Sequence, residues 1–397
     1  MARVMPLAAV RYAAVRDLPG LLAPPYDVIN DRELARLNRL APHNITHLTL
    51  GSSLRKRSYR EISRRFRKWL DDGVMVQDPR RAFYAYCQDY LFDGHPLRFW
   101  GLLGLLKLEP FGAGNIYPHE AVLPEPVEDR MRVMEHARAN LEPIMTLYRQ
   151  ISDPMDMLFE SLEGLPPLIS ATFPGGNRHR VWRLPLSQTC ARIQRNLRGL
   201  KLFVADGHHR YHAAWMFRQR HRRLSGADWI LSLVANTEQK GMRINPIHRY
   251  FTCAQVITAD LPRSLATFGR IERLGSRARA VMEPGRNAIG FYARGTGAWF
   301  LHLPPLPERL KPRETLEVVR LHELIPQVAR VADVKFPKDP EEAAAAARRS
   351  PSVLAVFLPP ISSHLITSIA FGGETLPQKS TFFLPKPASG LVLRLIE

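Results

Sequence analysis

Cysteine is scarce in this chain of 397 residues, which contains only Cys87, Cys190 and Cys253. An odd number of widely separated cysteines does not form a disulfide framework and lacks the paired spacing of a structural zinc site. We therefore expect reduced thiols and a cytoplasmic protein.

Long apolar runs are also missing. The run "FWGLLGLL" at residues 99–106 is too short to cross a bilayer, which takes about 20 helical residues. Near the N-terminus, "VMPLAAV" is followed at once by Arg11, which is not the pattern of a signal peptide. We expect neither a membrane segment nor a membrane partner.

Acidic residues are few relative to basic ones: 37 Asp and Glu against 56 Lys and Arg leave a net charge of +19. Such a charge favours anionic partners, including nucleotides, phosphorylated metabolites and nucleic acid. Much of the excess lies in residues 54–70 and 218–223. The first segment has apolar residues at helical spacing, so it is interpreted either as a solvated helix face or, less favoured, as a nucleic-acid contact.

The order of the patterns predicts a mixed α/β (α+β) protein with mixed sheets. The length suggests two parts, at roughly 150 residues per domain, which we place at 1–150 and 151–397, or one intertwined unit. A hairpin is expected around "YLFDGHPLRF" because of its Asp-Gly turn, and residues 45–50 ("ITHLTL") read as a β-like run. Helices are expected near 31–39, 56–72, 126–139, 153–162, 187–197, 209–222 and 340–350, the last on the surface. Strands are expected at 143–149, 201–205, 229–236 and 244–251, and a strand pair around 169–183.

The segment "FVADGHHRYHAA" at 203–214 places polar residues between a β run and a helix pattern. Amide groups at a helix N-terminus, a glycine that permits close approach, and Arg210 together suit a phosphate. His208 and His209 add donors, and Asp206 is a candidate magnesium ligand. A transition-metal site and a capped structural turn remain alternatives, although the sequence has no HExxH or comparable ligand spacing.

Other polar segments have a similar character. Glu120, after His119, is a candidate general base. Asp27 follows Tyr26 in "PPYDVI", and is either a turn cap or a site carboxylate. Asp129 and Arg130 are interpreted as a structural pair. The run Lys379, Ser380, Thr381 in "PQKSTFFLPKPASGL" is similar to the end of a Walker A loop, but the upstream glycines are absent, which excludes a P-loop.

Five motifs in order, "PPYDVI", "PHEAVLPEPVEDR", "ADGHHRYHAA", "NPIHR" and "PQKSTFFLPKPASGL", resemble the prokaryotic family of domain of unknown function 1015 from about residue 6 to the C-terminus. More distantly, "DGHHR" after a strand resembles the phosphate box of the ParB and sulfiredoxin superfamily, which includes free-serine kinases. That resemblance implies a ParB/sulfiredoxin-like nucleotide-binding unit, with Mg²⁺ and ATP or ADP as cofactors.

The resemblance also implies roles for individual residues. Glu120, Asp206 and His208 would be catalytic, with Asp206 near magnesium. Nucleotide or phosphate binding is expected for Gly207, His208, His209, Arg210, Arg130, His248, Arg249, Lys379 and Ser380. Substrate binding is expected for Tyr26, Asp27 and His119. The expected activity is nucleotide-dependent phosphotransfer to a small hydroxylated metabolite, with serine as one candidate.

The sequence departs from the family's usual residues at two positions, and two alternative functions stay open. Val122 stands where the family usually has threonine, and Val127 where it usually has lysine. One alternative is a non-enzymatic nucleotide- or nucleic-acid-binding protein of ParB-like type. The other is a metal-dependent hydrolase built on His119, His208, His209 and His248.

Overall fold

The computed structural model describes residues 2–13, 18–51, 58–122, 124–173, 176–185, 188–258, 260–275, 278–305, 307 and 310–397. The chain divides into two compact units. Unit 1 comprises residues 1–118, 122–242 and 385–397, and unit 2 comprises 119–121 and 243–384. The expected division near residue 150 does not coincide with these units. Residues 151–242 belong to unit 1 because strand β8 (Ile144–Tyr148), before the expected boundary, pairs with β11 (Leu202–Asp206) and β12 (Trp229–Asn236) beyond it.

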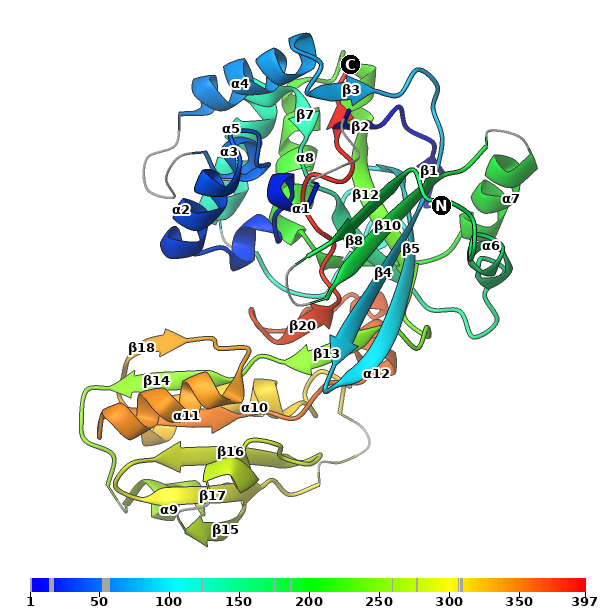
Figure 1. Cartoon of the computed structure of the whole chain (residues 1–397). Coiled ribbons are helices and arrows are strands. Elements are labelled where there is room, and N and C mark those ends of the chain that lie inside the picture. Colours follow the sequence, from blue (N-terminus) through cyan, green and yellow to red (C-terminus); the bar gives the residue numbers. More distant parts are fainter. Residues whose placement is uncertain are drawn as a thin grey trace. The chain divides into compact units, whose positions relative to one another are not determined.

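Unit 1 is built on a nine-stranded mixed sheet (Figure 1). Its order is β6-β11-β8-β12-β5-β4-β10-β9, and β1 also pairs with β5. The bounds are β1 Val4–Met5, β4 Tyr84–Phe92, β5 His95–Lys107, β6 Ile116–Pro118, β8 Ile144–Tyr148, β9 Ile169–Thr172, β10 Arg178–Arg183, β11 Leu202–Asp206 and β12 Trp229–Asn236. The β6–β11 and β8–β12 pairs are parallel, whereas the other pairs are antiparallel.

Helices and two short strand pairs complete unit 1. The helices are α1 Leu18–Leu21, η1 Tyr26–Val28, α2 Asp31–Leu40, α3 Thr46–Thr49, α4 Tyr59–Asp71, α5 Pro124–Ala137, α6 Asp156–Glu160, α7 Gln188–Leu197, α8 His208–Arg220 and η2 Ser225–Asp228. The strand pairs are β2 Val10–Tyr12 with β3 Met75–Gln77, and β7 Ala139–Asn140 with β21 Arg394–Leu395. The mixed α/β class expected from the sequence is therefore confirmed.

Local sequence signals explain several of these elements. The two-residue turn Asp93-Gly94 between β4 and β5 has positive φ at both residues, +48° and +76°, as a tight hairpin turn requires. Helix α4 begins after Ser58, whose side chain accepts a hydrogen bond from the Glu61 amide. The expected helix 56–72 is thus present, but residues 56–57 lie outside the described part of the chain.

The expectation of a β-like run at 45–50 was wrong, since residues 46–49 form α3. Asn44 explains the difference. Its side chain accepts hydrogen bonds from the Thr46 amide and hydroxyl, at 3.0 and 2.6 Å, which turns the chain into a helical start. This local bond outweighs the β preference of Ile45, Thr46 and Thr49.

Unit 2 holds a six-stranded antiparallel sheet (Figure 1) in the order β15-β17-β16-β19-β14-β18. The bounds are β14 Arg249–Cys253, β15 Arg270–Gly275, β16 Ala288–Ala293, β17 Gly297–His302, β18 Val331–Lys335 and β19 Val353–Phe357. Its helices are α9 Asp260–Leu265, η3 Ala278–Val281, α10 Glu317–Val328, α11 Pro340–Arg349 and α12 Ser363–Phe371.

Two expectations in unit 2 needed correction. Residues 244–251 are not one strand: β13, Arg243–Pro246, ends before Ile247 and pairs with β20, Thr381–Leu384, while β14 starts at Arg249. Helix α11 is not merely a surface helix, because its alanines Ala343, Ala344 and Ala347 are fully buried against the sheet. Small side chains allow this close approach, and the charged ends face solvent.

Candidate functional site

The turn that follows β11 depends on a glycine. Gly207 has φ +87° and precedes α8, in the left-handed region that side chains with a Cβ rarely adopt. A Cβ at this position would lie 2.9 Å from both Arg210 Nε and Ile144 Cγ2. The glycine therefore lets the Arg210 side chain fold back against its own turn.

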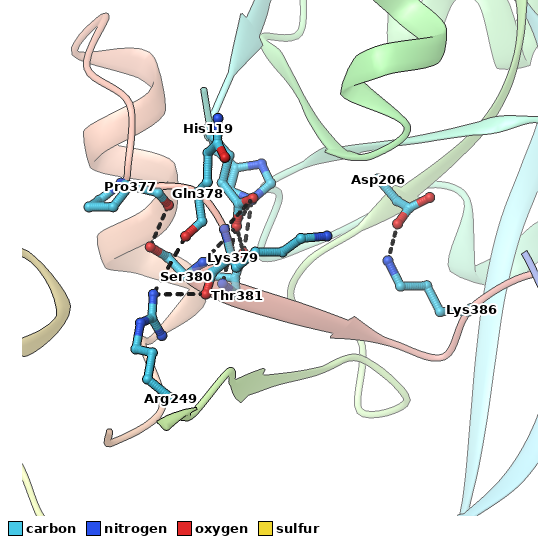
Figure 2. Close-up of polar contacts among 10 residues, drawn as sticks. His119, Asp206, Arg249, Pro377, Gln378, Lys379, Ser380, Thr381 and Lys386 are labelled. Atoms are coloured by element: carbon cyan, nitrogen blue, oxygen red, sulfur yellow. Dashed lines mark hydrogen bonds and ion pairs between the residues drawn. The ribbon is translucent and has the colours of Figure 1, made fainter. Parts of the chain in front are cut away.

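Two cationic side chains hold the Asp206 carboxylate. Arg210 Nη2 donates to Oδ2 at 2.5 Å, and Lys386 Nζ donates to Oδ1 (Figure 2). Side-chain exposures are 9% for Asp206, 10% for Arg210 and 13% for Lys386. Burial alone would raise the pKa of the Asp206 carboxyl, but Lys386, Arg210 and then His208 hold this pKa well below its usual range. Asp206 is therefore ionised and forms ion pairs with two cationic side chains at the start of α8.

Arg210 also braces the surrounding chain. Its Nη1 donates to the Pro143 carbonyl at 2.6 Å, and its guanidinium carbon lies 5.7 Å from the Tyr26 ring centroid. Arg130 lies 4.2 Å from the same centroid and donates to the Thr49 carbonyl. A cavity of about 30 Å³, lined in part by Arg130 and Arg210, has room for little more than a water molecule. Arg210 Nη1 and Nη2 already have acceptors, whereas its buried Nε has no hydrogen-bond partner among the described residues, and its expected role in phosphate binding stays a prediction.

Tyr26 joins these arginines to Glu142. Its amide donates to Glu142 Oε1 at 3.2 Å, and the Ser389 hydroxyl donates to the same oxygen. Burial raises the pKa of Tyr26 to about 12, against the opposing charges of Arg130 and Arg210. Tyr26 is thus a neutral ring at ordinary pH, suited to stacking under guanidinium groups rather than to proton transfer.

The remaining predicted residues of unit 1 differ in burial. His208 is buried in the first turn of α8, His209 is half-buried, and Asp27 is exposed in η1. Asp129 accepts from Arg130 Nη2 at 2.5 Å, so the structural pair expected from the sequence is confirmed. Val127 packs with Met131 and Ala213, and Val122 lies against the same small apolar cluster, so the two departures from the family pattern are in one environment.

A second carboxylate, Glu120, is bound in unit 2 by a backbone nest. Its Oε1 accepts from the amides of Ser380 and Thr381 and from the Thr381 hydroxyl, each at 3.1 Å, and its Oε2 accepts from the Lys379 amide at 3.3 Å. Lys379 has φ +57°, which turns successive amides toward one point. A general base needs a lone pair directed at the substrate. The lone pairs of Glu120 Oε1 are committed to three donors.

His119 supports the same arrangement. Its Nε2 lies 2.9 Å from Thr381 Oγ1, and that hydroxyl donates to Glu120. Since a hydroxyl has one proton, His119 Nε2 must be the donor in its contact with Thr381. His119 therefore orders the nest, and its predicted role in substrate binding stays a prediction.

Arg249 secures the turn that carries the nest. Its Nη2 donates to the Lys379 carbonyl at 3.0 Å (Figure 2), and its Nη1 donates to the Ile247 carbonyl. Burial lowers the pKa of Arg249 to about 10, and burial together with Arg249 lowers that of His248 to about 4. Both side chains are fully or nearly fully buried, and their expected role in nucleotide binding stays a prediction.

The predicted site residues thus separate into two sets. Unit 1 brings together the motifs around Tyr26, Arg130 and Asp206 with Lys386, and unit 2 brings together those around Glu120, Arg249 and Ser380. Across the described part of the chain, no group of three or more His, Cys, Asp or Glu side chains could hold a metal ion. The histidines of the hydrolase alternative belong to both units, His208 and His209 to unit 1 and His119 and His248 to unit 2, and that alternative stays a prediction.

Sequence reasoning missed Glu142 and Ser389 of the unit 1 cluster and assigned no role to Lys386. Lys386 belongs to a motif that was recognised, but 180 residues separate it from Asp206. Its position between two prolines in "LPKPASG" was the one available signal of a fixed backbone. Glu142 sits in the unremarkable segment "NLEPI", and nothing local marks its burial.

Comparison with known proteins gives the family. The family described as "Protein of unknown function (DUF1015)" matches residues 4–333. The chain belongs to this family. No curated protein matches the chain, and no helix within the described ranges is both long and apolar enough to span a membrane.

Solved structures show a distant likeness. A free serine kinase in complex with AMP is 13% identical, with a TM-score of 0.36, over 70% of this chain and 89% of that one. SbnI from Staphylococcus aureus, with a C-terminal truncation, is 13% identical, with a TM-score of 0.40, over 74% and 87%. A conserved hypothetical protein from Pyrococcus furiosus is 13% identical, with a TM-score of 0.37, over 71% and 92%. Scores this low decide nothing about activity.

Proposed function

We propose that this member of the family binds the phosphate groups of a nucleotide at the Asp206–Arg210 turn of unit 1. The observation that carries the proposal is the Lys386 ammonium held beside Arg210 on one carboxylate at the start of α8. Both cations are largely shielded from water, so their electrostatic attraction for a bound phosphate is strong and their positions are fixed by the fold. Lys386 keeps the larger exposed fraction and can exchange Asp206 for a phosphate oxygen by rotation of its own side chain.

The finer proposal is phosphotransfer to a small hydroxylated metabolite. The bond between phosphorus and the bridging oxygen of the nucleotide breaks, and a bond forms to the acceptor hydroxyl oxygen. The hydroxyl proton passes to an imidazole nitrogen of His208, and Lys386 with the α8 N-terminus stabilises the charge on the transferred group. Serine is the first acceptor to try, because the sequence motifs resemble those of free-serine kinases.

Magnesium does not fit Asp206 in this arrangement. Both carboxylate oxygens already accept from cationic side chains, Oδ1 from Lys386 and Oδ2 from Arg210. A cation bound there would have to displace a like charge, so no step of the proposal passes through a metal held by Asp206.

Calorimetric titration of the purified protein with ATP, ADP and CTP tests the binding step. Replacing Lys386 with methionine keeps the apolar stem and removes the charge, so affinity should fall by about 10- to 100-fold, the worth of a charged hydrogen bond. The matched control is Lys335→Met, which removes an exposed lysine paired with Asp333 in unit 2. Unchanged affinity in the Lys386 variant, or no binding by any nucleotide, would overturn the proposal.

Mass spectrometry of acceptor mixtures tests the transfer step separately. We expect phosphoserine, or another phosphorylated alcohol, to form at the expense of the nucleotide, and to do so more slowly in a His208→Gln variant. Nucleotide binding without any phosphorylated acceptor would sink the phosphotransfer proposal and leave the binding proposal intact.

A further inference from the structure

Two arginine-rich segments far apart in the sequence reach one surface of unit 1. Helix α5 packs against α4, which carries the first segment, and against α8, which ends in the second (Figure 1). Glu135 of α5 accepts from Arg220 Nη1 of α8 at 3.0 Å, so this side chain links the end of α8 to the α4–α5 face. The fold therefore links Arg220 of the second basic run to the helix that packs against the first.

A groove of about 790 Å³ lies between α4 and α5. Its cationic lining comprises Arg60, Arg64, Arg67, Lys68 and Arg138. The first three project from α4 with spacings of four and three residues, so they share one face and span about 10 Å along the helix. The opposite face of α4 is anchored in the interior by Ile62, Phe66 and Trp69. The arginine face is therefore exposed by the way α4 packs.

The charge on this groove is not balanced internally. Its acidic lining is Asp71, Asp72 and Glu135, of which Asp72 pairs with Lys68 and Glu135 with Arg220. Within the described ranges, Arg60, Arg64, Arg67 and Arg138 form no ion pair. Four positive charges therefore face one remaining carboxylate, and all four arginines are exposed.

We propose that this groove binds the phosphate backbone of double-stranded nucleic acid. Arginine spaced along a helix suits a row of phosphates, because each guanidinium donates two parallel hydrogen bonds. A single strand is not the expected ligand, because single-strand sites add aromatic stacking platforms. Of the described residues that line the groove, His136 alone has an aromatic ring. The lining of the groove contains no residue of the Asp206 cluster, so the inference does not rest on the proposed nucleotide site.

The salt dependence of binding measures the number of phosphates contacted. Each contact on a duplex contributes about −0.9 to the slope of log affinity against log salt. Four arginines predict a slope of about −3.6, equivalent to a fall of about 150-fold between 50 and 200 mM salt. Fluorescence anisotropy of a labelled 20-base-pair duplex, with the same strand alone as a comparison, gives both slopes for the full chain.

A matched pair of double variants tests the location. Replacing Arg64 and Arg67 with glutamine should make the slope shallower by about 1.8, so that the same change in salt costs only about 12-fold. The control replaces Arg192 and Arg195 of α7, which are exposed and form no ion pair within the described ranges, with glutamine. It removes the same charge from the same unit and should leave the slope unchanged. Thermal melting of each variant checks that it is folded.

Three outcomes would overturn the inference. These are no duplex binding by the unmodified protein, equal effects of the two double variants, and a single strand that binds as tightly as the duplex with the same slope. A steep slope lost only in the Arg64 and Arg67 variant supports it.

Discussion

Replacement of Glu120 distinguishes a structural role of its carboxylate from a catalytic role. In Glu120→Ala, the amides of Ser380 and Thr381 lose their acceptor, although these residues are only 2% and 8% exposed. A buried donor left without a partner costs about 1–3 kcal/mol, so the two amides together cost about 2–6 kcal/mol. Because the Glu120 side chain is 15% exposed, water can partly replace the carboxylate, and we expect a loss of about 3 kcal/mol.

The conservative variant should behave differently. Glutamine can place its amide oxygen at the Oε1 position, where three of the four donors converge, and loses only the contact with the Lys379 amide. We expect a cost of about 1 kcal/mol for Glu120→Gln. An exposed glutamate of the same unit, Glu283, provides the control, and its replacement by alanine should change stability by less than about 0.5 kcal/mol.

Hydrogen exchange followed by mass spectrometry reports on the nest directly. A loss of about 3 kcal/mol corresponds to exchange about 100-fold faster in peptides that cover 379–384. Peptides from β4 and β5 in unit 1 should keep their protection. Glu120→Ala with unchanged exchange at Ser380 and Thr381 would refute the reasoning. Glu120→Gln with intact protection but no activity would instead support the general base expected from the sequence.

Two further predictions concern unit 1. His179 is 3% exposed, and burial lowers its pKa to about 4. As the pH falls, this imidazole is therefore protonated at a higher pH in the unfolded chain than in the folded one. The full contribution of neutral His179 to the free energy of unfolding should be present above pH 6.5, and about 3 kcal/mol of it should be lost as the pH drops to 4. Urea titrations across this range measure the loss, which should be smaller in His179→Gln. An equal loss in the variant would contradict this prediction. For the Asp206 pair, Asp206→Asn should cost about 3 kcal/mol by leaving Lys386 and Arg210 without a counter-charge. Adding Lys386→Met should recover part of that cost in a double-mutant cycle, whereas strict additivity would show that the pair is not coupled.

Local signals in the sequence were sufficient where the decisive contact is also local. The β4–β5 hairpin follows from Asp93-Gly94, and the start of α4 follows from Ser58 and Glu61, because in each case the interacting groups are within a few residues. The strand–turn–helix at 202–220 was predicted for the same reason, although α8 begins at His208, one residue earlier than expected.

Contacts between distant segments could not be predicted in this way. β13 pairs with β20 across more than 130 residues, and residues 119–121 join unit 2 although their neighbours on both sides belong to unit 1. Periodicity describes one segment at a time and does not specify its partner. The same limit hid Glu142 and Ser389, because the bond between them and the contact of Glu142 with the Tyr26 amide join segments far apart in the sequence.

The two bound carboxylates differ in how readily they could be replaced, and this difference favours unit 1 as the phosphate site. Asp206 is held by side chains, and rotation about the bonds of Lys386 alone would release one of its oxygens. Glu120 is held by consecutive backbone amides, which the Arg249 contacts with the Lys379 carbonyl fix in place. A phosphate at Lys379–Thr381 would have to expel a carboxylate from a rigid nest. At Asp206 it needs only to attract one lysine, which requires far less rearrangement of the fold.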